Sequence, residues 1–258
     1  MERLNREKSA RINTSGVRTW GMIILVLGLV GSSIIQNQML GIGQASAQQI
    51  LEAMQASQNV MALVTVALVL QAIETCAAPI FCFLLVEGFR HTSSFQNYLL
   101  RVAGVALISE LPYNLALTGS LFDMGSRNPV FGMVLGLILL YFYNRYSQRS
   151  FAHVAIKIAV SLAALVWANM LKIDGGACCV VMVAALWMFR KNEGYRNLFA
   201  CVAAGACIVF SPFYLASPMG VMAIHAYNGE KGAENRLVNY LWYPMVLLLF
   251  ALVGKFFF

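Results

Sequence analysis

Long apolar stretches without charges recur along almost the whole of this 258-residue chain. A stretch of about 20 mostly apolar residues matches the hydrocarbon thickness of a bilayer. Backbone in lipid has to satisfy its own hydrogen bonds, so such stretches are expected to be helical. The sequence therefore predicts an all-α, polytopic bundle of transmembrane helices. The candidate spans are 20–38, 60–89, 95–117, 129–146, 152–171, 175–189, 197–212 and 236–257.

The composition excludes a soluble domain. Only 11% of the residues are charged and 60% are hydrophobic, whereas a soluble domain carries about 25% charged residues. The net charge of +7 includes no long basic arm and no alternation of basic and aromatic residues, so we expect no nucleic-acid partner. Membrane lipids are the expected surroundings.

The six cysteines all lie inside apolar runs, and none forms a CxxC pair. Thiolate metal sites usually carry such pairs. A cysteine in an apolar helix ordinarily behaves as a small apolar residue. We therefore expect neither a disulfide nor a bound metal.

A ninth apolar segment, 213–225, is short and is interrupted by Pro218 and Gly220. It is either a short span or a re-entrant segment. With nine spans and a cytoplasmic N-terminus, the inner side receives 15 of the 18 lysines and arginines. Without that crossing the inner side receives 13. Since inner loops carry the excess of positive charge, the counts favour about nine spans (eight to ten), with the N-terminus inside.

The ends of the chain and its longest loop complete this map. Residues 1–19 form a basic cytoplasmic tail, and 20–258 form a single membrane domain. The apolar run from Trp20 to Leu40 is too long for the core of a signal peptide, so we interpret it as the first span. The loop 41–59 has no lysine or arginine, and its segment 45–57 is expected to form a short helix on the outer surface.

Three carboxylates fall inside the predicted spans: Glu74, Glu87 and Glu110. Ionisable groups are costly in a bilayer, so each is a candidate for function. Each can equally be a packing group that hydrogen-bonds between helices.

Glu87 and His91 are four residues apart and share a helix face at the inner end of the second span. A carboxylate beside an imidazole can fix its tautomer and raise its basicity, as a general base requires. Arg90 and Arg101 lie at the same end. Their guanidinium groups suit phosphates or lipid headgroups, or serve only to set the topology.

Glu110 and Asn114 also share a face, and Pro112 between them kinks the helix. Such a kink either accompanies a binding pocket or serves only the packing of the helix. Asn128 follows in the next outer loop, and Asn228 precedes Gly229 in a turn. Spacing alone does not separate a turn from a ligand clamp at Asn228.

Five segments of the chain, in the same order, resemble the TraX family. They cover most of the chain between about 75 and 250. The segments are APIFCFLLVEGFRHT (Ala78–Thr92), YLLR (Tyr98–Arg101), LISELPYNLA (Leu107–Ala116), YNGEKG (Tyr227–Gly232) and YLWYP (Tyr240–Pro244).

The resemblance implies acyl transfer. The family is named for a conjugal-transfer protein that acetylates the N-terminus of pilin, and it is similar to membrane acyltransferases that take the acyl group from acyl-CoA at the cytoplasmic side. It implies acetyl-CoA or another acyl-CoA as co-substrate, an unidentified peptide, amine or glycan acceptor, and the cytoplasmic membrane of a bacterium. The matched positions are Glu87, His91, Arg101, Glu110, Asn114, Asn128, Asn228 and Tyr243.

The chain departs from the family pattern in two places. Family members usually carry an Asp–His pair in the first span, but 27–35 here has no ionisable residue. They usually carry a histidine shortly after the Tyr-Pro of the last span, and none follows Pro244. His91, oriented by Glu87, is then the leading base, and Glu110 is the second candidate. The alternative is a degenerate member that acts as a transporter or as a subunit of a membrane complex with a protein partner.

Overall fold

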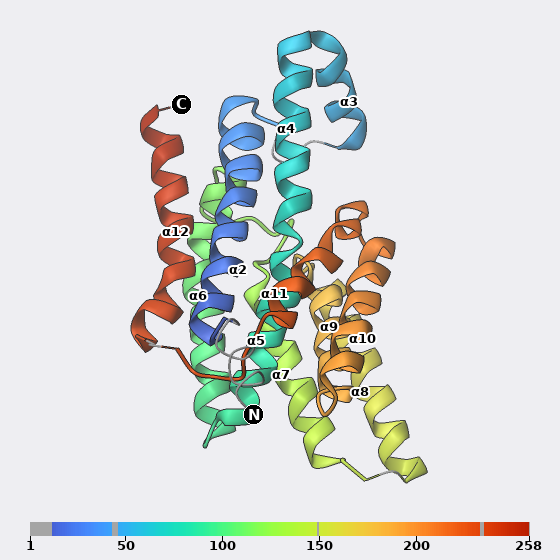
Figure 1. Cartoon of the computed structure of the whole chain (residues 1–258). Helices are drawn as coiled ribbons and strands as arrows, with labels where there is room; N and C mark the ends of the chain where they lie inside the picture. The colour runs from blue at the N-terminus through green and yellow to red at the C-terminus, as the bar shows by residue number, and fades with distance from the viewer. Residues whose placement is uncertain (1–11, 43–45, 149, 233–234, 258) are drawn as a thin grey trace, which may run out of the picture.

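The computed structural model describes residues 12–42, 46–148, 150–232 and 235–257, and within these ranges it is helical (Figure 1). Its only extended pairings there are two isolated bridges. The expected all-α fold is therefore confirmed. The main helices are α2 (Thr14–Leu29), α3 (Ala47–Ala56), α4 (Gln58–Glu74), α5 (Ala77–His91), α6 (Phe95–Thr118), α7 (Val130–Arg145), α8 (Phe151–Met170), α9 (Gly176–Met188), α10 (Glu193–Ala206) and α12 (Arg236–Phe257).

Within the described residues, five helical stretches are long and apolar enough to cross a membrane. They are 14–39, 58–91, 95–118, 151–170 and 237–254. The predicted spans 129–146, 175–189 and 197–212 also form helices, but α7, α9 and α10 have only 16, 13 and 14 residues. These lengths are below the roughly 20 residues of an ordinary span. The apolar pattern therefore located the helices better than it predicted their lengths.

The first helix is longer than expected and changes character along its length. It begins at Thr14, where the Asn13 side chain accepts a hydrogen bond from the Gly16 backbone. Residues 14–19 of the expected tail are thus helical, and 1–11 lie outside the described residues. From Val30 to Met39 it continues as a π-helix, labelled η1. Side chains of η1 bond to carbonyls of other helices, including Ser33 to Ala116 at 2.7 Å.

The predicted span 60–89 consists of two helices, α4 and α5, which meet at a break over Thr75 and Cys76. Pro79 favours the break, since it has no N–H to donate to the Thr75 carbonyl, which accepts from the Ala78 N–H at 3.2 Å. The Thr75 hydroxyl lies 2.7 Å from the Ala72 carbonyl and 3.0 Å from the Phe213 carbonyl of η3 (Pro212–Leu215). A helix end thus lies inside the protein rather than at its surface.

The segment 213–225 is not one continuous helix. After α10 the chain makes three short 3₁₀ turns and a five-residue helix: η2 (Cys207–Val209), η3 (Pro212–Leu215), η4 (Ser217–Gly220) and α11 (Val221–His225). This path leads from the α4–α5 break back to the start of α2, where Ile12 and Ala226 share a backbone hydrogen bond of 2.8 Å. Irregular backbone is tolerated at membrane depth where protein surrounds it.

In Figure 1, α2 runs upwards, α4 and α5 run downwards one after the other, and α12 runs upwards, so the start of α2 and the C-terminus lie at opposite ends of the bundle. The expected short helix in 45–57 is present as α3, beside the upper end of α4. The upper ends of α2, α4 and α12 stand well above those of α9 and α10 in this view. The bundle is therefore stepped at its upper end.

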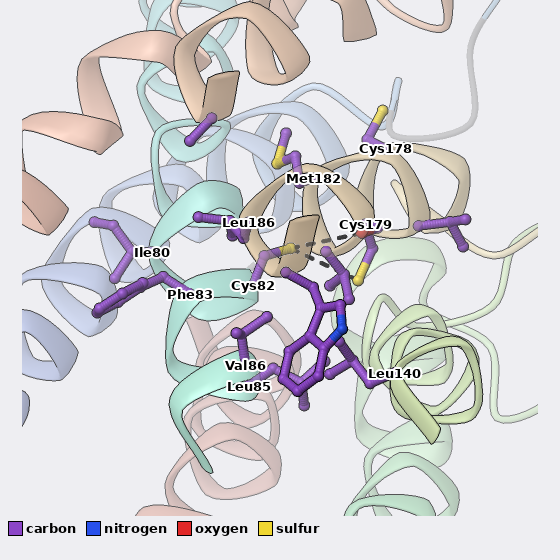
Figure 2. Close-up of a cluster of buried hydrophobic side chains, with 14 of the residues drawn as sticks. Ile80, Cys82, Phe83, Leu85, Val86, Leu140, Cys178, Cys179, Met182 and Leu186 are labelled. Atoms are coloured by element: carbon purple, nitrogen blue, oxygen red, sulfur yellow. Dashed lines mark hydrogen bonds between the residues drawn. The ribbon is translucent and has the colours of Figure 1, made fainter. Parts of the chain in front are cut away.

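The core is centred on α9, in which nine of 13 residues are buried. Phe83, Leu140, Met182 and Leu186 pack there from α5, α7 and α9 (Figure 2). The six cysteines are free thiols. Those of Cys82 and Cys179 are adjacent, with their sulfurs 3.7 Å apart (Figure 2).

Candidate functional site: a cavity through the bundle

A cavity of about 1120 Å³ runs inside the bundle. Its walls come from α2, the α4–α5 break, α5, α6, the α8–α9 turn, η3 and α12. Residues near the start of α2 and the end of α5 line its lower end, and residues of the α4–α5 break line its interior. The cavity thus connects one end of the molecule with its middle.

The lower end of the cavity, which we call the basic mouth, is defined by Arg18, His91, Arg101 and Lys231. Tyr98, Tyr227 and Tyr240 lie among the same lining residues. The Arg101 guanidinium carbon is 5.8 Å from the centre of the Tyr240 ring. Positive charge next to aromatic rings suits an anionic ligand that carries a flat group.

His91 is positioned by backbone rather than by the Glu87 carboxylate. Its Nδ1 is 2.9 Å from the Glu87 carbonyl oxygen and 3.6 Å from Glu87 Oε2. A carbonyl only accepts, so Nδ1 is the donor in this hydrogen bond. The carboxylate instead accepts a 2.6 Å hydrogen bond from Arg90. The spacing of Glu87 and His91 indicated their proximity, but Arg90 takes the carboxylate.

The interior of the cavity contains a second acidic group that sequence reasoning missed. Asp174 lies in the α8–α9 turn, and its Oδ2 accepts a hydrogen bond from the Tyr113 hydroxyl at 3.2 Å. Glu74, the last residue of α4, lines the same cavity, and both carboxyl groups lie beside η3, because Thr75 contacts Phe213 and Gly175 contacts Tyr214. We call Glu74 and Asp174 the inner carboxyl pair. The Tyr243 side chain lies near both carboxyl groups.

The α8–α9 turn is held in place by a neighbouring loop. The Arg127 N–H donates to the Lys172 carbonyl, and the Asp174 N–H donates to the Arg127 carbonyl, each at 2.9 Å. Lys172 and Gly175 adopt positive φ angles of 51° and 60°. Its position among the helices raises the pKa of the Asp174 carboxyl by desolvation, although hydrogen bonds from Tyr113 and the Gly175 backbone partly oppose this rise.

Gly28 of α2 lies directly against Glu74. A Cβ at position 28 would overlap the Glu74 side chain, including its Oε2 atom. The absence of a side chain at Gly28 therefore sets how closely α2 approaches Glu74.

Glu110 lies outside the cavity lining and is fully engaged. It accepts hydrogen bonds from Arg127 (2.8 Å), from the Asn128 backbone (3.2 Å) and from Asn128 Nδ2 (2.6 Å). Asn128 Nδ2 also donates to the Ala106 carbonyl at 2.9 Å, and its Oδ1 accepts from the Val130 N–H. This arrangement fastens the loop before α7 to α6.

The nine residues selected from the sequence thus fall into two groups. Those that line the cavity are Glu87, His91, Arg101 and Tyr243. Those outside its lining are Arg90, Glu110, Asn114, Asn128 and Asn228. Asn114 is buried, and Asn228 stabilises its own turn by accepting a 2.9 Å hydrogen bond from the Glu230 N–H. Of the three histidines, His91 alone lines the cavity, while His225 bonds to Asn197.

The family comparison covers most of this architecture. A family model described as "TraX protein" matches residues 55–254. The chain belongs to the TraX family. That range includes the α4–α5 break, the inner carboxyl pair and most of α12, but not α2 with Arg18.

One curated relative agrees with this assignment. It is described as "Probable fimbrial assembly protein FimC, serogroup H1" of Dichelobacter nodosus, and it is 25% identical over 195 residues. The match covers 66% of this chain and 77% of the relative. No solved structure matches. The resemblance inferred from the sequence segments is therefore confirmed at the level of the family.

Proposed function

We propose that this TraX-family protein is a membrane acyltransferase of the bacterial cytoplasmic membrane, with its N-terminus in the cytoplasm. It transfers an acyl group, foremost acetyl, from acyl-CoA to an amine or hydroxyl of an acceptor. The observation that carries this proposal is the single cavity that connects the basic mouth with the inner carboxyl pair.

The basic mouth fits the phosphate-bearing part of acyl-CoA. Arg18, Arg101 and Lys231 offer several N–H donors, and charge-assisted hydrogen bonds to phosphate are among the stronger polar contacts. The neighbouring tyrosine rings can pack against adenine. His91 contributes an imidazole, either as a phosphate ligand or as a proton acceptor.

The length of the cavity fits the flexible arm of acyl-CoA that carries the thioester. Glu74 and Glu87 are 13 positions apart in sequence, which corresponds to roughly 20 Å along a helix. A nucleotide held at the mouth would direct its thioester towards the interior. Small-molecule pockets usually occupy about 300–1,000 Å³, so about 1120 Å³ leaves room for an acceptor group beside the donor. Direct transfer in one ternary complex follows from this arrangement.

The first test is direct binding of acetyl-CoA to the full chain in lipid nanodiscs, measured by isothermal titration calorimetry. Arg101→Gln should weaken binding about tenfold or more, because a hydrogen bond to a charged group contributes about 1.5–3 kcal/mol. Arg145→Gln is the matched control, since Arg145 is exposed at the end of α7 and does not line the cavity. The proposal fails if the wild type does not bind acetyl-CoA, or if both variants bind equally well.

The second test is cleavage of the acetyl-CoA thioester, followed with radiolabelled acetyl groups. One observation favours a degenerate member instead: α2 and α12 bring no imidazole to the cavity. Binding of acetyl-CoA without turnover would support that alternative. Absence of both acetyl-CoA binding and turnover would indicate a transporter or a subunit of a membrane complex. The name of the relative in D. nodosus suggests that such a complex would assemble fimbriae.

A further inference from the structure

We propose that Glu74 and Asp174 act together as the proton-accepting group of the transfer reaction, holding one proton between them. This inference rests on the proposed acyltransferase function and extends it. It assigns the proton transfer to carboxyl groups in the interior of the cavity, whereas the sequence pattern favoured the histidine at its mouth.

Two interrupted helices bring the pair together. Glu74 ends α4 at the break before α5, and Asp174 precedes α9 in the α8–α9 turn. Both ends lie inside the protein, and the same cavity reaches both. Broken helices that place polar groups at membrane depth are a recurrent way to build binding sites in membrane proteins.

The surroundings of the pair supply hydroxyl groups but no compensating cation. No lysine or arginine of the described chain lies close enough to offset the charge of either carboxyl. Lys172 lines the cavity without pairing with either one. The titratable groups that interact with the pair are Tyr113 of α6, Cys178 of α9, Tyr214 of η3 and Tyr243 of α12.

The residues next to the two carboxyl groups border the same short helix, η3: the Thr75 hydroxyl lies 3.0 Å from the Phe213 carbonyl, and Gly175 lies against the Tyr214 hydroxyl. Two carboxyl groups held in one cavity do not both ionise readily, so we expect the pair to hold one proton. The remaining negative charge can accept a proton from a nucleophile. Glu74 forms no side-chain hydrogen bond or ion pair within the described chain. It is therefore free to contact a ligand, while Tyr113 holds Asp174 in place.

With the pair as base, the transfer forms one bond, breaks one bond and moves one proton. The acceptor nitrogen or oxygen forms a bond to the carbonyl carbon of the thioester. The C–S bond breaks, and its electron pair stays on the sulfur of CoA. The proton of the acceptor passes to the pair and then to the CoA thiolate, which restores the starting protonation. The Tyr243 hydroxyl lines the same cavity and supplies a donor for the intermediate oxyanion, while the Tyr113 hydroxyl stays bonded to Asp174.

A carbodiimide that dissolves in membranes tests the proton directly, because it reacts with protonated carboxyl groups in apolar surroundings. We expect one dicyclohexylcarbodiimide adduct per chain near neutral pH, at Glu74 or Asp174, located by peptide mass spectrometry. In Glu74→Gln and Asp174→Asn, the pH of half-maximal labelling of the remaining carboxyl should fall by about one unit or more, since the like charge is removed. Glu52→Gln on exposed α3 is the control and should leave labelling unchanged.

Kinetics separate this base from His91. With acetyl-CoA as substrate and water as acceptor, Glu74→Gln and Asp174→Asn should lower kcat about 100-fold or more while acetyl-CoA still binds. His91→Ala should mainly raise KM for acetyl-CoA. The inference is overturned if neither carboxyl is labelled at any pH, if the single variants leave the labelling midpoint unchanged, or if only His91→Ala abolishes kcat.

Failure of the two proposals can be distinguished. If the wild type does not bind acetyl-CoA, the acyltransferase function fails, whatever the labelling shows. If the wild type binds and cleaves acetyl-CoA but the carboxyl variants retain its kcat, the function stands and the inner carboxyl pair is not the base.

Discussion

Replacement of Glu110 by alanine should destabilise the protein strongly and should do so without a specific effect on acetyl-CoA binding. The Glu110 carboxylate accepts two hydrogen bonds from Asn128, which is fully buried, and one from Arg127. Without that carboxylate, the buried Asn128 donors lose a charged partner, and the loop that carries Arg127 is released from α6.

The magnitude follows from these contacts. A hydrogen bond to a charged group contributes about 1.5–3 kcal/mol, and the two Asn128 bonds, which are partly buried, are each counted at the lower limit. The Arg127 side chain is 35% exposed, so its ion pair adds only about 1 kcal/mol. A loss of roughly 4 kcal/mol is therefore expected for Glu110→Ala. For a chain of this size, the midpoint of thermal unfolding should fall by roughly 8–16 °C. Glu110→Gln keeps an acceptor oxygen and should cost less.

Tryptophan fluorescence of the protein in one detergent, recorded during heating, measures the effect. Glu52→Gln provides the matched control, because Glu52 is exposed on α3. A melting temperature within about 2 °C of the wild type for Glu110→Ala would refute the structural role. Loss of acetyl-CoA cleavage at unchanged stability would instead support the catalytic role that the sequence suggested for Glu110.

Three further changes test the packing around the cavity. Gly28→Ala should lower the melting temperature, because its methyl group would overlap Glu74 and overpacking costs about 1–3 kcal/mol. In the control Gly104→Ala, the methyl group meets no atom within 4 Å, so the melting temperature should not fall. Equal losses in the two variants would contradict the close contact of Gly28 with Glu74. Gln38→Leu removes a 2.9 Å hydrogen bond to a carbonyl of α12 and should cost about 1 kcal/mol, so a variant as stable as the wild type in the same melt would count against it. Because the pKa of Asp174 is raised in the folded protein, the wild type should lose stability relative to Asp174→Asn as the pH rises above the ordinary pKa of an aspartate. Melts at several pH values measure this difference, and parallel stability profiles of the two proteins would contradict the raised pKa.

The sequence predicted the helices well because apolar runs are a strong local signal. Each predicted span except 213–225 overlaps a helix, although 60–89 covers two helices and 197–212 runs beyond the end of α10. In 213–225, Pro218 and Gly220 interrupt the backbone. The number of crossings is harder to predict, since hydropathy does not reveal where a helix ends inside the protein. The break between α4 and α5 illustrates this, because Pro79 separates two helices within one continuous apolar run.

Only part of the site could be predicted, because contacts between distant segments leave no local signal in the sequence. His91 and Arg101 stand out locally, and both line the cavity. Asp174 lies in the sequence Lys-Ile-Asp-Gly-Gly, which resembles an ordinary solvent-exposed turn. Only tertiary structure brings it near Glu74, 100 positions earlier in the chain. A charge in a turn directly before an unusually short apolar run was the available signal.

The stepped upper end of the bundle has a consequence for the surrounding lipid. At 1.5 Å per residue, α6 is about 36 Å long, whereas α9 and α10 are only about 20 Å long. A bilayer core is about 30 Å thick. Hydrophobic mismatch of this kind makes lipids thin or a protein tilt. The bilayer should therefore be thinnest beside α10. The upper ends of α9 and α10 should then lie close to water, although the neighbouring helices extend well above them.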